Sequence, residues 1–143
     1  MRILVADDDP LYRELFKELL TQWRFEVTVA GDGVEAWQLM QADDPPRLLL
    51  LDWMMPRMDG FEVCRKVRHE SGDNQTFILI VTGDGKKDQI LKVVLAGADD
   101  YLIKPFDEID LKVRLRNAVR VLNLQEDLDE LRRAVDRRPI RSA

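Results

Sequence analysis

The strongest constraint on the fold of this chain is that short apolar runs alternate five times with longer amphipathic stretches. The apolar runs predict strands at 2–6, 25–30, 47–51, 76–81 and 100–103. Stretches with apolar residues three or four positions apart predict helices at 10–22, 33–42, 60–70, 86–96 and 107 to about 136. Because such a repeat forms a parallel sheet covered by helices on both faces, we predict a doubly wound α/β fold with five strands.

The predicted helix boundaries carry the side chains that helix ends favour. Asp9 before Pro10 predicts an N-cap followed by proline at the first helical position, and Asp107 stands at the start of the last helix. Gly97 follows the fourth helix, where a left-handed C-cap favours glycine. The single cysteine, Cys64, cannot form a disulfide within the chain, and we predict that it is a small buried residue.

The composition describes a single soluble domain. The 143 residues are 45% hydrophobic and 34% charged. No apolar run approaches the ~20 residues that span a bilayer, so we expect no membrane segment. The net charge of −5 argues against a nucleic-acid-binding surface. Since a strand is predicted from Arg2 and leaves no room for a signal peptide, we expect a cytoplasmic location.

Two acidic groups follow predicted strands: Asp7, Asp8 and Asp9 after the first, and Asp52 after the third. Parallel sheets place their ligand sites outside the carboxyl ends of the strands, so we expect these carboxylates at one edge. Like charges held close together are accommodated by a bound cation or by a raised carboxyl pKa. Oxygen ligands without a nearby cysteine or histidine favour Mg²⁺, Mn²⁺ or Ca²⁺ over zinc.

The ends of two further strands add groups that bind anions. Thr82 follows the fourth strand and Lys104 follows the fifth. A hydroxyl and an ammonium beside an acidic metal site are suited to a phosphoryl group. Since Asp52 stands alone at a central strand while Asp7 and Asp8 are available to the metal, we predict that Asp52 is a nucleophile that forms an acyl phosphate.

Four segments resemble the receiver domains of two-component response regulators. They are ILVADDD at 3–9, LDWMMPRMDG at 51–60, VTG at 81–83 and GADDYLIKPF at 97–106. The resemblance spans residues 2 to about 122 and implies a flavodoxin-like sheet with strand order 2-1-3-4-5, in a receiver domain at 1–122. It also implies a regulatory domain rather than an enzyme, one that assists only its own phosphorylation and dephosphorylation.

The resemblance assigns the chemistry of the site. Asp52 is the expected acceptor of a phosphoryl group from a histidine kinase or phosphotransfer protein. Mg²⁺, for which Mn²⁺ can substitute, is expected on Asp8, Asp52 and the backbone carbonyl of Met54, with Asp7 assisting through water. Lys104 is the expected phosphate-binding ammonium.

The resemblance also implies how the state of the site is passed on. Thr82 is the expected switch hydroxyl and Tyr101 the expected switch aromatic. Phosphorylation of Asp52 is expected to draw the Thr82 hydroxyl inward, after which Tyr101 fills the vacated space. The surface formed by the fourth helix, the fifth strand and the fifth helix then changes.

The last predicted helix carries two offset apolar stripes. The first, suited to packing on the sheet, is Leu111, Leu115, Ala118 and Leu122. The second, spaced as a coiled-coil seam of two heptads, is Val121, Leu124, Leu128, Leu131 and Val135. We expect residues 123–143 to form an extended helix or linker that supports a homodimer. A solvated helical linker is the alternative.

Receiver domains followed by such a helix resemble the amino-terminal modules of larger regulators, notably diguanylate cyclases. We therefore expect an output domain beyond residue 143. The alternative is a stand-alone regulator that dimerises through its last helix.

Three other functions compete with the receiver. A metal-dependent phosphohydrolase of the haloacid dehalogenase type also uses an aspartyl nucleophile, and Asp7-x-Asp9 resembles its strand-one motif, but that function leaves Asp52 and Lys104 unexplained. A DNA-binding regulator needs a helix-turn-helix segment, which the sequence lacks after residue 122. An interaction module that ignores phosphorylation does not account for the acidic site.

Overall fold

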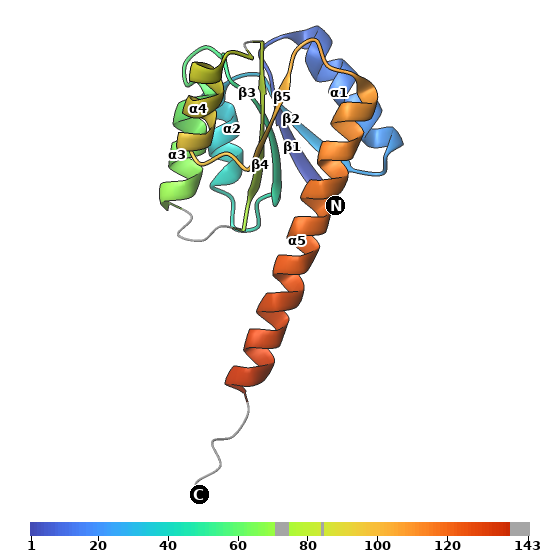
Figure 1. The fold of residues 1–143 in the computed structure, drawn as a ribbon, viewed down its shortest axis with the longest axis vertical. Coiled ribbons are helices and arrows are strands. Elements are labelled where there is room, and N and C mark those ends of the chain that lie inside the picture. The colour runs from blue at the N-terminus through green and yellow to red at the C-terminus, as the bar shows by residue number, and fades with distance from the viewer. Residues whose placement is uncertain (71–74, 84, 138–143) are drawn as a thin grey trace, which may run out of the picture.

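The computed structural model describes residues 1–70, 75–83 and 85–137 (Figure 1). The strands are β1 (Arg2–Ala6), β2 (Glu26–Ala30), β3 (Leu48–Asp52), β4 (Phe77–Thr82) and β5 (Asp100–Ile103). The helices are α1 (Pro10–Gln22), α2 (Gly33–Met40), α3 (Gly60–Glu70), α4 (Lys87–Leu95) and α5 (Glu108–Asp136). The predicted alternation of strands and helices is confirmed.

The five strands form one parallel sheet in the order β2-β1-β3-β4-β5. This is the predicted flavodoxin-like order. The leucines at 48–51 in β3 are at most 1% exposed, because helices cover the central strand on both faces. The chain reverses its direction of winding between β1 and β3, and the carboxyl ends of these two strands lie at the resulting crevice.

The helices form two layers. Figure 1 shows α1 and α5 on one face of the sheet and α2, α3 and α4 on the other. Successive side chains of a strand enter opposite layers: Ile3 and Val5 pack in the core with α1 and α5, whereas Leu4 and Ala6 pack in the core with the other three helices. Two apolar cores therefore hold the strand ends in fixed positions.

Most boundaries differ from the predicted ones by at most one or two residues. β3 and β4 each end one residue later than predicted because pairing in the sheet continues, with Asp52 opposite Val81 and Thr82 opposite Ile103. The helix predicted at 33–42 ends at Met40. Asp52 and Thr82 are thus the last residues of strands rather than loop residues.

The predicted caps are confirmed. The carboxylate of Asp9 accepts a hydrogen bond from the backbone N–H of Leu11 at 2.9 Å, and Asp107 caps α5 in the same way. Gly97 has a φ of +100°, the left-handed conformation predicted after the fourth helix. Cys64 is fully buried, also as predicted.

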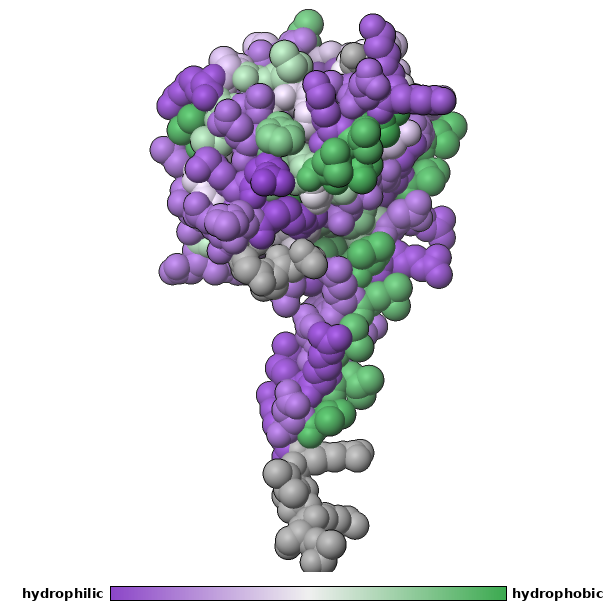
Figure 2. Space-filling model, turned by 60° about the vertical axis from the view of Figure 1, so that its left-hand side comes forward, coloured by the Kyte–Doolittle hydropathy of each residue, from purple (hydrophilic) through white to green (hydrophobic). Residues whose placement is uncertain are grey.

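The last helix continues beyond the domain (Figure 1). The first predicted stripe, Leu111 to Leu122, is buried against the sheet. The second stripe is 39–62% exposed at Val121, Leu124, Leu128, Leu131 and Val135. Figure 2 shows apolar atoms in a line along one side of the projecting helix. Residues 138–143 of the predicted segment 123–143 lie outside the described residues.

Two residues near the amino ends of the strands contact the projecting part of α5. Arg47 donates to the carbonyl of Leu122 at 3.4 Å and lies 3.5 Å from the carboxylate of Glu126. Gln75 Nε2 donates to Asp129 at 3.1 Å. Leu122, Glu126 and Asp129 share one helix face by their spacing, so the helix is attached to the domain by a face other than the exposed stripe.

No helix among the described residues combines the length and the apolar character needed to cross a membrane.

Candidate functional site

Three carboxylates converge at the carboxyl edge of the sheet. Asp7 and Asp8 follow β1 and Asp52 ends β3, and one oxygen of each lies within 4.8 Å of the others. Asp7 and Asp52 are 1% and 8% exposed, whereas Asp8 faces solvent. The cluster predicted from the strand ends is therefore present, with two buried members and one open to the outside.

Lys104 reaches this cluster from the end of β5. Its Nζ donates to Asp7 Oδ2 at 2.8 Å and lies 3.5 Å from Asp52 Oδ2. One ammonium thus bridges the two buried carboxylates. The peptide bond between Lys104 and Pro105 is cis.

The electrostatics of the cluster match the expectation for crowded acids. The pKa of Asp52 is raised from 3.8 to about 7, chiefly by burial and then by the charge of Asp7, while Lys104 and a backbone hydrogen bond of Met54 oppose the rise. Burial lowers the pKa of Lys104, but its hydrogen bond to Asp7 and the nearby negative charges outweigh this and raise it. Near pH 7 the protein without a cation holds only part of its Asp52 in the charged form.

Thr82 and Tyr101 lie on the strands next to the cluster. Thr82 is 2% exposed, and its carbonyl accepts a hydrogen bond from the backbone N–H of Lys104 at 2.7 Å. Tyr101 is half-buried on β5, packs against the core under α4, and has the guanidinium of Arg114 5.5 Å from its ring centroid. Thr82, on β4, therefore lies between β3, which ends in Asp52, and β5, which carries Tyr101.

The other predicted residues occupy distinct positions. Met54, two residues after Asp52, is 72% exposed, and its backbone forms a hydrogen bond with Asp52. Asp9 turns its carboxylate to the first turn of α1. This leaves Asp7, Asp8 and Asp52 as the acids that face one another.

The donor atoms of the cluster fit a hard divalent cation. The three carboxylates supply only oxygen, and among the described residues they form the one group of three or more potential metal ligands that lies this close together. Mg²⁺ prefers such ligands and commonly retains water on its remaining positions, which the exposed side of Asp8 allows. A cation here also offsets the burial and the negative charge of Asp7 that together raise the pKa of Asp52.

Sequence reasoning missed three residues that organise this edge. The Tyr12 ring lies under the Lys104 ammonium, 3.9 Å from ring centroid to Nζ. Arg13 donates to the Asp7 carbonyl at 2.8 Å. Asp32, after β2, pairs with Arg57 at 3.1 Å. A helix that follows a strand begins at the same sheet edge, so its first turn was the available signal for Tyr12 and Arg13.

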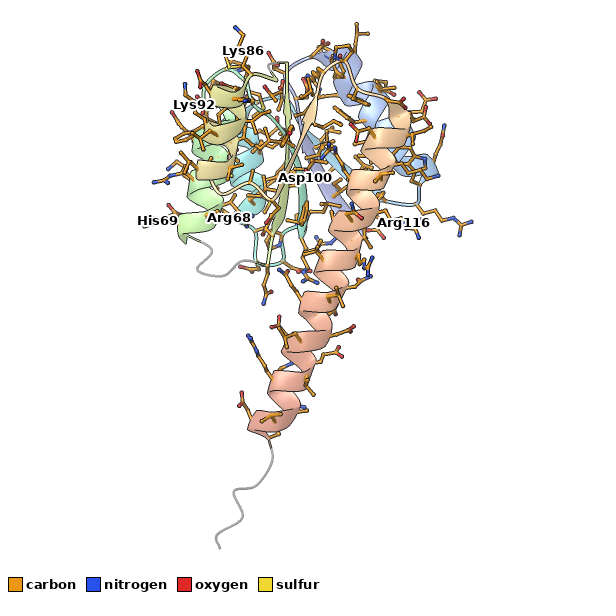
Figure 3. The ribbon with its side chains drawn as sticks, viewed as in Figure 1. Arg68, His69, Lys86, Lys92, Asp100 and Arg116 are labelled. Carbon is orange, nitrogen blue, oxygen red and sulfur yellow. The ribbon has the colours of Figure 1, made fainter. Side chains whose placement is uncertain are left out.

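Figure 3 shows labelled side chains at the two opposite ends of the strands. Lys86 lies at the carboxyl edge, just before α4, whereas Arg68 and His69 lie at the far end of α3. The acidic cluster belongs to the first of these ends, since Asp7 and Asp8 follow β1 and Asp52 ends β3.

The chain belongs to the response regulator receiver domain family. The family model matches residues 3–116, which is most of the domain and includes every residue of the site. The fold and the acidic edge described above are those of this regulatory class.

Individual relatives agree with this membership. The chain is 42% identical over 127 residues to the response regulator MprA of Mycobacterium ulcerans, covering 89% of this chain and 53% of MprA. It is 35% identical over 116 residues to the chemotaxis protein CheY1 of Helicobacter pylori, covering 80% of this chain and 94% of CheY1. The chain thus spans about half the length of MprA and nearly all of CheY1.

A solved structure has the same fold. The receiver domain of the sensor histidine kinase PA1611 of Pseudomonas aeruginosa superposes with a TM-score of 0.73 at 25% identity, covering 81% of this chain and 94% of that domain. That structure has a magnesium ion coordinated in its active-site cleft.

Proposed function

We propose that this chain is a phosphorylation-controlled switch that accepts a phosphoryl group on Asp52 from a histidine kinase or a phosphotransfer protein in the cytoplasm. The observation that carries the proposal is the convergence of Asp7, Asp8 and Asp52 within 4.8 Å, with the Lys104 ammonium on the two buried carboxylates. A nucleophilic carboxylate, a cation site and a phosphate-binding ammonium are the parts that acyl phosphate formation requires.

In the proposed site, Asp7, Asp8, Asp52 and the backbone carbonyl of Met54 hold Mg²⁺, or Mn²⁺ in its place. The bound ion neutralises phosphoryl charge during transfer. The magnesium in the related PA1611 domain supports this assignment, as does the all-oxygen donor set of this chain.

Side chains of this protein carry out the attack on the phosphoryl group and bind its oxygens. Asp52 attacks the phosphorus as a carboxylate, so the proton that its raised pKa retains must leave first. As the new O–P bond forms, the bond between phosphorus and the donor breaks, and its electron pair leaves with the donor. Lys104 and the Thr82 hydroxyl then bind phosphoryl oxygens, which places a charge-assisted hydrogen bond at the end of β4. The burial of Asp7 and Asp52 limits water at the new acyl phosphate.

The same hydrogen bond gives the proposed route of the signal. When the Thr82 hydroxyl moves toward the phosphoryl group, Tyr101 moves into the space beside it, and the surface of α4, β5 and α5 changes. The backbone hydrogen bond between Lys104 and Thr82 and the half-buried position of Tyr101 support this route. Tyr101→Ala is expected to be phosphorylated normally while its surface fails to respond, as read by amide exchange in α4 and α5.

We further propose that the projecting part of α5 forms a homodimer and leads to an output domain beyond residue 143. The exposed seam and the attachment of the helix through Arg47 and Gln75 on a different face support the dimer. The coverage of only 53% of MprA supports the output domain. In this proposal the segment itself binds neither nucleic acid nor membrane.

Labelling with acetyl phosphate and Mg²⁺ tests the central proposal. One phosphoryl group per chain is expected by intact-mass spectrometry, with none in Asp52→Asn. Repeated turnover of p-nitrophenyl phosphate without a labelled chain would support the competing phosphohydrolase instead. Labelling that survives in Asp52→Asn would overturn the assignment of the acceptor.

A further inference from the structure

The ammonium of Lys104 is held by an aromatic ring as well as by carboxylates. Its Nζ lies 3.9 Å from the centroid of the Tyr12 ring, while it donates to Asp7 at 2.8 Å. An ammonium over an aromatic face is attracted by the negative charge on that face. Tyr12 lies in the first turn of α1, which begins at Pro10 just after the acidic residues of the β1–α1 connection.

The Tyr12 ring is itself fixed by neighbouring rings. Its centroid lies 6.1 Å from that of Phe16 and 6.2 Å from that of Phe106, and these two rings stack at 5.2 Å. Phe16 is 1% exposed and belongs to the core between α1, α5 and the sheet. The ring under Lys104 is thus the outer member of a cluster anchored in the core.

Partners of two different kinds, carboxylates and an aromatic ring, act on the same ammonium. The hydrogen bond to Asp7 has a fixed direction, whereas the attraction of the ring face holds the charge over an area. A lysine side chain is otherwise flexible through four carbons. An ammonium that must leave Asp7 for a phosphoryl oxygen therefore still has a partner during the exchange.

We propose that Tyr12 is a positioning residue that holds the Lys104 ammonium over the acidic cluster, ready to bind the phosphoryl group transferred to Asp52. The role rests on the proposed phosphorylation of Asp52. It requires the aromatic ring and not the phenolic hydroxyl, because the contact is made with the ring face.

Matched variants distinguish an effect of Tyr12 on the position of the Lys104 ammonium from an effect on the packing of α1. Tyr12→Phe keeps the ring, and Tyr12→Leu removes it while leaving an apolar side chain. Trp23→Leu is the control: Trp23 lies at the other end of α1 with the Lys112 ammonium 5.6 Å from its ring, so this change also removes a ring beneath a lysine, but away from the site. Urea unfolding of all three gives the stability against which activity is compared.

The experiment measures the initial rate of Asp52 labelling by acetyl phosphate in the full chain, at varied donor and Mg²⁺ concentrations. Tyr12→Leu is expected to lower the maximal rate about three- to tenfold, the size of a partly buried cation–π contact. The Mg²⁺ concentration for half-maximal rate is expected not to rise. Tyr12→Phe and Trp23→Leu are expected to stay within about twofold of the unsubstituted chain.

Equal rates for Tyr12→Leu and Tyr12→Phe would overturn the positioning role. An equal loss in Trp23→Leu would also overturn it, since the effect would then follow stability. Failure of the unsubstituted chain to become labelled at Asp52 would instead refute the proposed function, so the two failures are distinguishable.

Discussion

The guanidinium of Arg68 forms an ion pair with the carboxylate of Asp99 at 2.5 Å, joining the end of α3 to the start of the segment that enters β5. The same guanidinium donates to the carbonyl of Gly97 at 2.8 Å and to that of Thr76 at 2.6 Å. Asp99 in turn accepts from the backbone N–H of Ile78 at 2.8 Å. Figure 3 shows Arg68 at the end of α3 that lies away from the acidic edge.

Arg68→Ala is expected to destabilise the domain by about 2–4 kcal/mol, because two backbone carbonyls and a carboxylate lose a charged donor. Arg68→Lys should recover part of this, since one ammonium replaces only some of the bonds of the planar group. Urea unfolding measures both. Arg65→Ala, at an exposed neighbouring position, is the control and is expected to cost less than about 0.5 kcal/mol. Equal losses of stability in Arg65→Ala and Arg68→Ala would contradict the stabilising role of the Arg68 interactions.

Gly33→Ala is expected to displace the loop that follows Asp52. A Cβ on Gly33 would lie 1.8 Å from the carbonyl oxygen of Met58, a backbone atom that cannot rotate away. We expect a loss of about 1–3 kcal/mol in urea unfolding and slower labelling of Asp52. Gly83→Ala meets no atom within 4 Å and is the stability control. A Gly33→Ala chain as stable as Gly83→Ala would contradict this close packing.

Asp52 is expected to make stability depend on pH when Mg²⁺ is removed by a chelator. Its pKa is about 7 in the folded protein, against 3.8 for an unperturbed aspartate, so the folded state holds the proton more tightly than the unfolded chain does. The contribution to stability is therefore full below pH 3.8 and is lost as the pH rises through 7.

Asp52→Asn removes this titration. The free energy of unfolding of Asp52→Asn minus that of the unsubstituted chain is expected to rise by roughly 2–4 kcal/mol from pH 4 to pH 8. Urea unfolding at the two pH values measures the gain. Saturating Mg²⁺ should abolish or reverse it, because the carboxylate then has a cation partner. A difference between the two chains that does not change with pH would contradict the raised pKa.

The exposed second stripe of α5, which has the spacing of a coiled-coil seam, is expected to support self-association. Leu128→Gln and Leu131→Gln should each weaken a dimer about tenfold, because each removes an apolar side chain that only a partner buries. Sedimentation over a range of concentrations measures the change, with and without beryllofluoride and Mg²⁺. Glu130→Gln, on the same part of the helix but outside the seam, is the control. Identical sedimentation of all four chains would rule out the seam as the interface.

The order of the elements and the residues that reach one edge follow from the pattern of residues along the chain. Short runs such as the four leucines at 48–51 have no polar side to expose and are too short for a helix, so they predict strands buried on both faces. Parallel strands then bring their carboxyl ends together, which is why Asp7, Asp52, Thr82 and Lys104 were identifiable from the order of residues alone. Helix caps such as Asp9 are local, and local interactions are readable from neighbouring residues.

How these groups act on one another depends on their distances in the folded protein. The pKa of Asp52 depends on burial and on the distance to Asp7 and Lys104, and the ring of Tyr12 meets Lys104 across more than ninety positions of sequence. Arg47 and Gln75 likewise meet α5 only because β3 and β4 lie beside it. Such contacts depend on distances that are set by the packing of the layers against one another. The periodicity of residues along the chain does not predict those distances.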